Sequence, residues 1–290
     1  MSEPPTRSPS PRVGDHRPVT WRPPRVVSTD RGEGPVALLL HGQPGQGSDW
    51  DDVAAGLASS NRVLVPDRPG YGRTGGPAVG LAANADSLDC LLDDKGVGSA
   101  TVVGHSFGGG VALAMALRHG HRVRALVLVD SVGTGRSIGP YDRVLGLPGL
   151  GEALTFAGWE LSRRLLPALR RRSTRLPPAL GAWLRAIPQT SVSPDGDRRD
   201  GGSTWRSFVT EQRALLAETP SIEAGLGSVR VPTVVVAGRR DRLVPARATA
   251  ELADAIPGAE LVWVPGVGHL VPQEAPGVLV EIIRRHASGR

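Results

Sequence analysis

The chain has 290 residues, the size of one large α/β domain or of two modest ones. Its formal net charge of +6 names no partner by itself, because Lys95 is the only lysine among 34 cationic residues and the rest are arginines. A single cysteine, Cys90, excludes an internal disulfide framework. Residues Met1–Pro18 are rich in Pro, Ser and Arg and lack the apolar stretch of a signal peptide, so we expect a disordered tail and a cytoplasmic protein.

From residue 36 onward, short apolar runs alternate with longer helical patterns. The runs are apolar on both faces, which is typical of strands buried in a parallel sheet. The predicted strands are Val36–Leu40, Arg62–Val65, Ala100–Val103, Val123–Val129, Thr233–Ala237 and Glu260–Val264. The predicted helices are Trp50–Ser59, Leu81–Lys95, Phe107–His119, Ala246–Ala255 and Pro276–Ala287. This alternation predicts an α/β fold, a mostly parallel doubly wound sheet with helices on both faces.

One long stretch, residues 132–220, interrupts that alternation. It contains no strand-like run, and its helical patterns are broken by prolines. We therefore expect a helical cap, or lid, inserted into a core formed by residues 19–131 and 221–290. Within the cap, Ser191–Ser203 is polar and glycine-rich, which is typical of a mobile loop.

The strongest local signal is the run Gly104–Gly109, with Ser106 at its centre. It follows one predicted strand and precedes a predicted helix, so Gly-x-Ser-x-Gly here indicates a nucleophile elbow. The glycines on either side of Ser106 remove Cβ atoms that would clash in so tight a turn. The serine hydroxyl is then presented at the carboxyl end of the sheet, where doubly wound folds bind ligands.

A serine hydroxyl needs a base, and the base needs an orienting acid, which follow the serine in the order acid, then histidine. His269 lies just after the last predicted strand, at the same sheet edge as Ser106, and is the predicted base. His119, His121 and His286 lie on or next to helices away from that edge.

Two aspartates at strand ends are candidates for the acid. Asp241 follows the strand Thr233–Ala237 and neighbours the histidine loop, whereas Asp130 follows Val123–Val129 and leads into the cap. We favour Asp241, but chain order fits both residues and leaves Asp130 open as a structural or substitute acid.

Acyl transfer also needs donors aimed at the developing oxyanion. The turn His41–Gly45 follows the strand Val36–Leu40, where a backbone amide can face Ser106. The N–H groups of Gln43 and Phe107 are the predicted oxyanion hole, because Pro44 has no N–H to donate.

Taken together, the span from Val36 to His286 resembles the α/β-hydrolase superfamily, in the branch with a helical cap. The resemblance rests on five segments in order: His41–Gly45, Asp67–Thr74, the elbow at Ser106, the Asp241 loop and the Gly268–His269 loop. It implies a catalytic triad with Ser106 as nucleophile and a structural role for Asp67–Gly72. Members with an aspartate nucleophile, epoxide hydrolases and haloalkane dehalogenases, are disfavoured because this chain has serine at that position.

The resemblance predicts a serine hydrolase of the esterase type, acting on a small, mainly apolar ester or related carbonyl compound. The alternatives are carbon–carbon bond hydrolysis or cofactor-free perhydrolysis on the same triad, or a non-catalytic binding protein on this scaffold. Apolar cap residues favour the apolar substrate. They are Phe156, Trp159, Trp183, Trp205 and Phe208.

We expect a small-molecule substrate and no cofactor, metal or nucleic-acid partner, since the sequence has no His/Cys cluster with ligand spacing and no Gly-Lys-Ser/Thr phosphate motif. The basic stretch Arg163–Arg172 on the cap could contact a membrane surface, but a solvated helix face is favoured. Cys90 is expected in the core.

Overall fold

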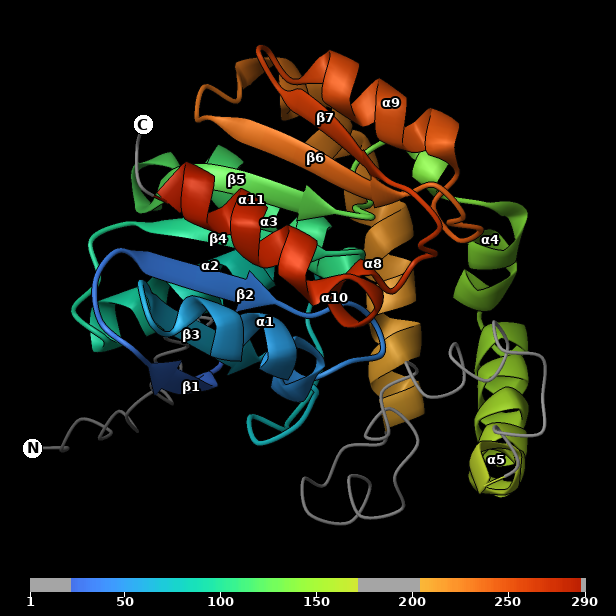
Figure 1. The fold of residues 1–290 in the computed structure, drawn as a ribbon. Helices are drawn as coiled ribbons and strands as arrows, with labels where there is room; N and C mark the ends of the chain where they lie inside the picture. Colours follow the sequence, from blue (N-terminus) through green and yellow to red (C-terminus); the bar gives the residue numbers. More distant parts are fainter. Residues whose placement is uncertain (1–21, 172–203, 288–290) are drawn as a thin grey trace, which may run out of the picture.

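The computed structural model describes residues 22–171 and 204–287, built around one seven-stranded sheet (Figure 1). The strand order is β1-β3-β2-β4-β5-β6-β7, and every pair is parallel except β1 with β3. The strands are β1 Val27–Arg31, β2 Val36–Leu40, β3 Arg62–Asp67, β4 Ala100–His105, β5 Val123–Val129, β6 Thr233–Gly238 and β7 Glu260–Val264. The predicted α/β class and mostly parallel sheet are therefore confirmed.

The edge strand β1 is the strand that the sequence did not predict. Its five residues, Val-Ser-Thr-Asp-Arg, do not alternate between apolar and polar side chains and are mostly exposed. They therefore lack the apolar pattern by which a strand is predicted. It pairs antiparallel with β3, from Val27 opposite Asp67 to Arg31 opposite Val63. An exposed edge strand needs charged and polar side chains to discourage pairing with other chains, which explains its composition.

Helices cover both faces of the sheet. The α-helices are α1 Asp51–Leu57, α2 Leu81–Asp94, α3 Phe107–Arg118, α4 Pro140–Gly146, α5 Leu150–Arg171, α8 Thr204–Gly225, α9 Ala246–Ala255, α10 Val271–Glu274 and α11 Pro276–Ala287. Short 3₁₀ helices are η1 Gly47–Trp50, η2 Gly120–Arg122, η3 Gly135–Ser137 and η6 Leu226–Ser228. The five predicted core helices are all present, with ends within two residues of the prediction.

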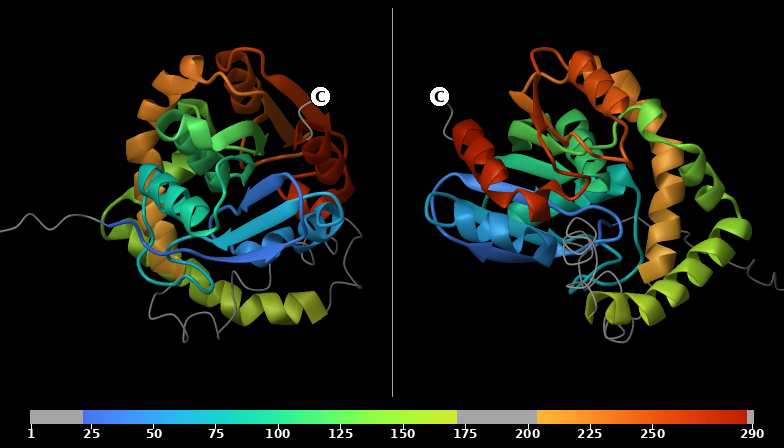
Figure 2. Two further views of the ribbon diagram at one scale, coloured as in Figure 1. Left: turned by 90° about the vertical axis from the view of Figure 1, so that its left-hand side faces the viewer. Right: turned by 45° about the vertical axis from the view of Figure 1, so that its right-hand side comes forward.

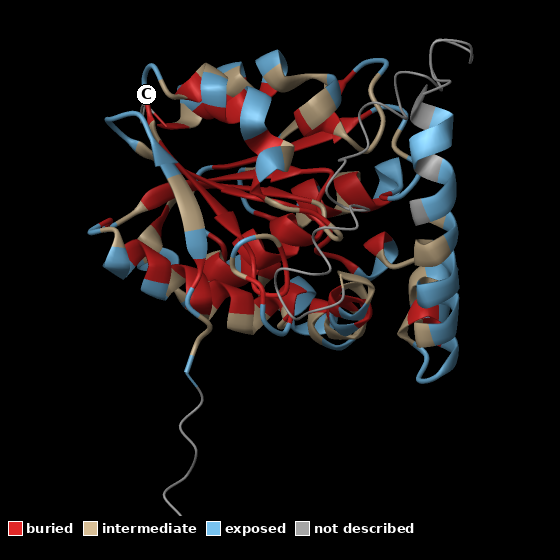
Figure 3. Ribbon diagram, turned by 90° about the horizontal axis from the view of Figure 1, so that it is seen from below, coloured by how far each residue is buried: buried red, intermediate tan, exposed pale blue. Residues whose placement is uncertain are grey.

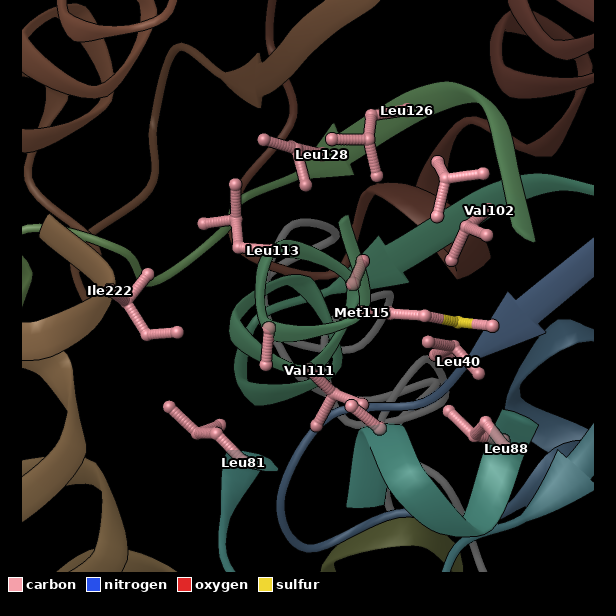
Figure 4. Close-up of a cluster of buried hydrophobic side chains, with 14 of the residues drawn as sticks. Leu40, Leu81, Leu88, Val102, Val111, Leu113, Met115, Leu126, Leu128 and Ile222 are labelled. Atoms are coloured by element: carbon pink, nitrogen blue, oxygen red, sulfur yellow. The ribbon is translucent and has the colours of Figure 1, made fainter. Parts of the chain in front are cut away.

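Two apolar clusters form the core, one on each face of the sheet. One cluster joins the sheet to α2, α3 and α9, with side chains such as Leu88, Met115 and Leu128 at its centre (Figure 4). The other joins the sheet to α1 and α11, through residues such as Leu57 and Ile283. The strands are buried between these layers, as Figure 3 shows in red.

Between β5 and β6 the described residues form helices and no strand. Helix α8 runs past the carboxyl edge of the sheet and contacts α2 and α3, while α4 and α5 pack on its outer side (Figure 2). The loop expected at Ser191–Ser203, the tail Met1–Pro18 and the indole of Trp183 lie outside the described residues. The limits of the cap, 132–220, stay a prediction.

The prediction that Cys90 lies in the core was wrong, because its side chain is exposed. The buried residues of α2 include Leu88, Leu91 and Leu92, which share one face. Residue 90 follows residue 88 by two positions, and two steps of an α-helix turn by about 200°, which points the thiol the other way. None of the helices in the described ranges has both the length and the apolar character that a bilayer span requires.

Candidate active site

Ser106 occupies a strained turn between β4 and α3. Its φ of 53° and ψ of −118° lie outside the ordinary regions for a residue with a Cβ, and its N–H is held by the carbonyl oxygen of Val129 at 2.9 Å. The turn is so tight that a Cβ on Gly104 would collide with the Gly108 carbonyl, and a Cβ on Gly108 would collide with the Leu40 carbonyl. The glycines of the motif are thus required by the packing around Ser106.

His269 lies in the loop between β7 and α10, next to Asp241 in the loop after β6. The two side chains are joined by a hydrogen bond of 2.8 Å between His269 Nδ1 and Asp241 Oδ2. Asp241 Oδ1 also accepts the N–H groups of Leu243 at 2.7 Å and Val244 at 3.1 Å. Burial opposes ionisation of Asp241, but His269 and these two amides outweigh it and lower the pKa of the carboxyl below its usual value.

Asp130 lies at the end of β5, close to this pair, but it does not hydrogen-bond the imidazole. Its Oδ1 accepts the N–H of Gly238 at 2.9 Å, and its side chain is fully buried. Burial, reinforced by the charge of Asp241, raises the pKa of Asp130 well above its usual value. Of the two candidate acids, the structure therefore pairs Asp241 with His269.

His105, the residue before Ser106, contacts the His269 loop directly. Its Nε2 lies 2.8 Å from the carbonyl oxygen of His269, and the two rings are 4.9 Å apart between centroids. A carbonyl only accepts, so His105 Nε2 carries the proton. Burial, with the nearby His269, lowers the pKa of His105 to about 3, which keeps this imidazole neutral. The sequence analysis named His105 only as part of the elbow motif.

The turn His41–Gly45 lies against Ser106. A Cβ placed on Gly42 would lie 3.2 Å from the Cβ of Ser106 and 3.1 Å from His105 Nδ1, so the two loops are in contact. Phe107 is the first residue of α3, and N–H groups in the first turn of a helix have no partner inside the helix. The backbone around both predicted oxyanion donors, Gln43 and Phe107, therefore borders the serine.

A buried ion pair that no sequence motif indicated links the His41–Gly45 turn to helix α8. Both side chains, Arg68 after β3 and Glu211 on α8, are completely buried and form a direct ion pair. Arg68 also donates to the carbonyl oxygens of His41 at 3.0 Å and Gly42 at 2.8 Å, and Glu211 accepts the Tyr71 hydroxyl at 2.7 Å. No motif signalled Glu211, because a single acid on a helix pattern looks like any solvated residue.

A second link runs through amide side chains. Gln43 Nε2 lies 2.9 Å from Gln212 Oε1, and Gln212 Nε2 lies 2.9 Å from Asp142 on α4. Gln212 of α8 thus contacts the turn that borders Ser106 directly, and Glu211 is linked to the same turn through Arg68.

In the described part of the chain, no hydrogen bond joins Ser106 Oγ to the imidazole of His269. The structure brings Asp241 and His269 together and places Ser106 beside them, through its neighbour His105. Catalytic hydrogen bonds are often long without substrate and shorten when it binds, so this spacing is compatible with a nucleophile and its base.

Ligand atoms of His105, Asp130 and His269 lie within 4.8 Å of one another, close enough to suggest a metal site. However, Nε2 of His105 faces a carbonyl and Nδ1 of His269 faces a carboxylate, so both nitrogens must carry protons. These hydrogen bonds, with that from the Gly238 N–H to Asp130, account for the contacts within the group, and we assign it no metal.

The predicted cap residues are partly described. The rings of Phe156 and Trp205 pack edge to face at 5.5 Å, which holds α5 against α8. Leu161 and Leu165 are exposed on α5, beside Arg164 of the basic stretch. Arg172 lies outside the described residues.

Comparison with known proteins identifies the family of this chain. The model of the alpha/beta hydrolase fold family matches residues 35–276. A 2-hydroxymuconate semialdehyde hydrolase of Pseudomonas putida is 34% identical over 247 residues, which are 83% of this chain and 82% of the relative. Among solved structures, a thermophilic esterase from Thermogutta terrifontis is 25% identical with a TM-score of 0.70, covering 91% of this chain and 93% of that one. Est816, an N-acyl homoserine lactone degrading enzyme, is 28% identical with a TM-score of 0.63, covering 90% and 96%. The chain therefore belongs to the alpha/beta hydrolase fold family.

Proposed function

We propose that the protein is a serine hydrolase that uses Ser106, His269 and Asp241 as a catalytic triad. The observation that supports this most directly is the hydrogen bond of 2.8 Å between His269 Nδ1 and Asp241, beside a serine held at a positive φ. Asp241 fixes the imidazole tautomer, which leaves His269 Nε2 free to act as a base.

In the proposed mechanism, His269 Nε2 takes the proton of Ser106 as its oxygen attacks a carbonyl carbon. The N–H groups of Gln43 and Phe107 stabilise the negative oxygen of the tetrahedral intermediate. The imidazolium then gives its proton to the leaving group, and an acyl group remains on Ser106. A water molecule, deprotonated by the same imidazole, attacks this acyl-enzyme and releases the acid.

For the substrate we propose a small, mainly apolar ester. The esterase and the lactone-degrading enzyme among the solved structures are similar to this chain over nine-tenths of its length. Apolar side chains also lie on α5 and α8 of the cap, including Phe156, Trp205 and Phe208. We further propose the cytoplasm as its compartment, on the expectations from the sequence.

Labelling with a fluorophosphonate probe tests the nucleophile. We expect the protein to become labelled, and Ser106→Ala to abolish the label while the exposed-serine control, Ser48→Ala, keeps it. If the protein does not label, or if Ser106→Ala labels as well as the control, the proposed nucleophile is wrong.

The second candidate is hydrolysis of a carbon–carbon bond next to a carbonyl, in a product of aromatic ring cleavage. The 34% identity to 2-hydroxymuconate semialdehyde hydrolase favours it. A panel of p-nitrophenyl esters of increasing chain length, assayed beside a ring-cleavage product, separates the two. Faster turnover of short esters supports the esterase, whereas turnover of the ring-cleavage product alone supports the carbon–carbon hydrolase.

A further inference from the structure

The Asp130 carboxyl group has an unusual environment that the proposed mechanism does not use. The residue has a φ of 44°, one of two positive values among the described residues other than glycine, and the second belongs to Ser106. Such backbone strain is found where the surrounding structure holds a side chain in one particular place. Here the place is the end of β5, beside Asp241.

The two oxygens of Asp130 differ in what they contact. Oδ1 accepts the Gly238 N–H, but Oδ2 is buried and receives no hydrogen bond from a described donor. No ion pair with a lysine or arginine is present at Asp130 within the described ranges. A carboxyl oxygen of Asp130 lies within 4.8 Å of ring nitrogens of His105 and His269, so the group borders the Asp241–His269 pair, and the charge of Asp241 adds to burial in raising its pKa.

Two ionised carboxylates cannot hydrogen-bond each other, since both only accept. Neighbouring carboxyl groups in a buried site therefore do not both ionise, and one of them keeps a proton. Asp241 has three donors, from His269, Leu243 and Val244, which stabilise its negative charge. Asp130 has the Gly238 N–H at hydrogen-bond geometry, so the shared proton resides on Asp130.

We propose that Asp130 is a neutral carboxylic acid that donates a hydrogen bond to Asp241 and thereby positions the Asp241–His269 pair. The donated hydrogen bond partly neutralises the negative charge of Asp241. Less of that charge then remains to stabilise the imidazolium form of His269. Asp130 is thus a positioning residue and not the substitute acid that the sequence left open. Its role in turnover rests on the proposed function, whereas its protonation does not.

The first test observes the unmodified protein and needs no substrate. In protein with ¹³C-labelled aspartate, the Asp130 side-chain carbon, assigned by its loss in Asp130→Asn, is expected to keep the chemical shift of a neutral carboxyl throughout pH 5–8. A shift typical of a carboxylate at pH 7 would overturn the proposal. Failure of Ser106 to react with a fluorophosphonate would overturn the proposed function and leave this result standing.

The second test measures, in variants of Asp130, the pH midpoint at which His269 gains its second proton. NMR of labelled histidine and the acidic limb of kcat/KM both report this midpoint. The facing titratable groups are Asp241, Asp130 and His105; Glu274 on α10 holds the Gly268 N–H at 3.2 Å. Asp130→Asn keeps a donor, so we expect the midpoint to move by less than ~0.3 unit and kcat/KM to change by less than ~3-fold.

Asp130→Gly removes the donor but tolerates the positive φ. Without the donor, Asp241 interacts more strongly with the imidazolium, and the midpoint is expected to rise by ~0.5–1 unit. An ionised Asp130 predicts the opposite sign, a lower midpoint in both variants. A lower midpoint, or equal midpoints in the two variants, would overturn the positioning role. If circular dichroism shows that Asp130→Gly does not fold, the proposal is judged on the other two measurements. These are the midpoint of Asp130→Asn and the ¹³C chemical shift of Asp130.

Discussion

Replacing Glu211 by glutamine is expected to destabilise the protein by about 3–5 kcal/mol, the usual effect of removing one partner from a buried ion pair. Both side chains of the Arg68–Glu211 pair are 0% exposed, so water cannot solvate the guanidinium once the carboxylate is gone. Glu211 accepts Arg68 Nη2 at 3.3 Å and Tyr71 Oη at 2.7 Å, besides its shorter contact with Arg68 Nη1. Glutamine can keep the bond from Tyr71, but it carries no charge.

For a chain of this length, each kcal/mol lowers the melting temperature by about 2 °C, so we expect a fall of about 6–10 °C in calorimetry. The matched control is Glu281→Gln in the exposed pair Arg285–Glu281, whose side chains are 58% and 76% exposed. Such a surface pair contributes about 0–0.5 kcal/mol. A fall below about 2 °C for Glu211→Gln, or a fall equal to that of the control, would refute the argument.

Three further outcomes concern the active site. Gly238→Ala would place a Cβ against the Gly268 carbonyl, so we expect it to displace the histidine loop and to lower ester turnover at least ~10-fold. Gly227→Ala, which meets nothing within 4 Å, should leave turnover unchanged, and equal turnover in the two variants would contradict the packing. Asp241→Asn should lower kcat by ~10³–10⁴-fold with little change in melting temperature, because the imidazole loses its orienting charge; a loss below ~10-fold would argue against Asp241 as the acid. Burial, with the nearby imidazole of His269, lowers the pKa of His105 from 6.5 to about 3, so the unfolded chain binds a proton that the folded chain excludes. Stability should therefore fall as pH drops from about 6.5 toward about 3, by about 2 kcal/mol near pH 5 in urea titrations, and His105→Phe should lose that part of the fall.

The core strands and helices could be predicted because each gives a strong local signal. Strands such as Val123–Val129 are apolar on both faces, and α11 has a clear apolar stripe, so both ends of these elements were predicted correctly. Strand β1 could not be predicted, since an exposed edge strand depends on its partner β3 and not on its own residues. Cys90 lies outside the core because Leu88, Leu91 and Leu92 share the buried face of α2, and residue 90 points away from that face.

The candidate site likewise contains some residues that could be predicted from the sequence and others that could not. Ser106, His269 and Asp241 stand at strand ends, and the topology of a parallel sheet brings such ends to one edge. Chain order could not separate Asp241 from Asp130, whereas the hydrogen bond of 2.8 Å shows which aspartate meets the imidazole. Glu211 could not be predicted at all, because its partner is 143 residues away and only the folded chain reveals that it is buried.

The contacts of α8 also bear on how caps are exchanged between related hydrolases. Glu211 and Gln212 lie on α8, within the predicted cap, whereas their partners Arg68 and Gln43 lie in the loops after β3 and β2. A chimera that received a foreign segment in place of residues 132–220 would keep a buried arginine without its carboxylate. Replacing the predicted cap therefore requires both halves of each pair to be transferred together, because α8 does not pack as an independent module.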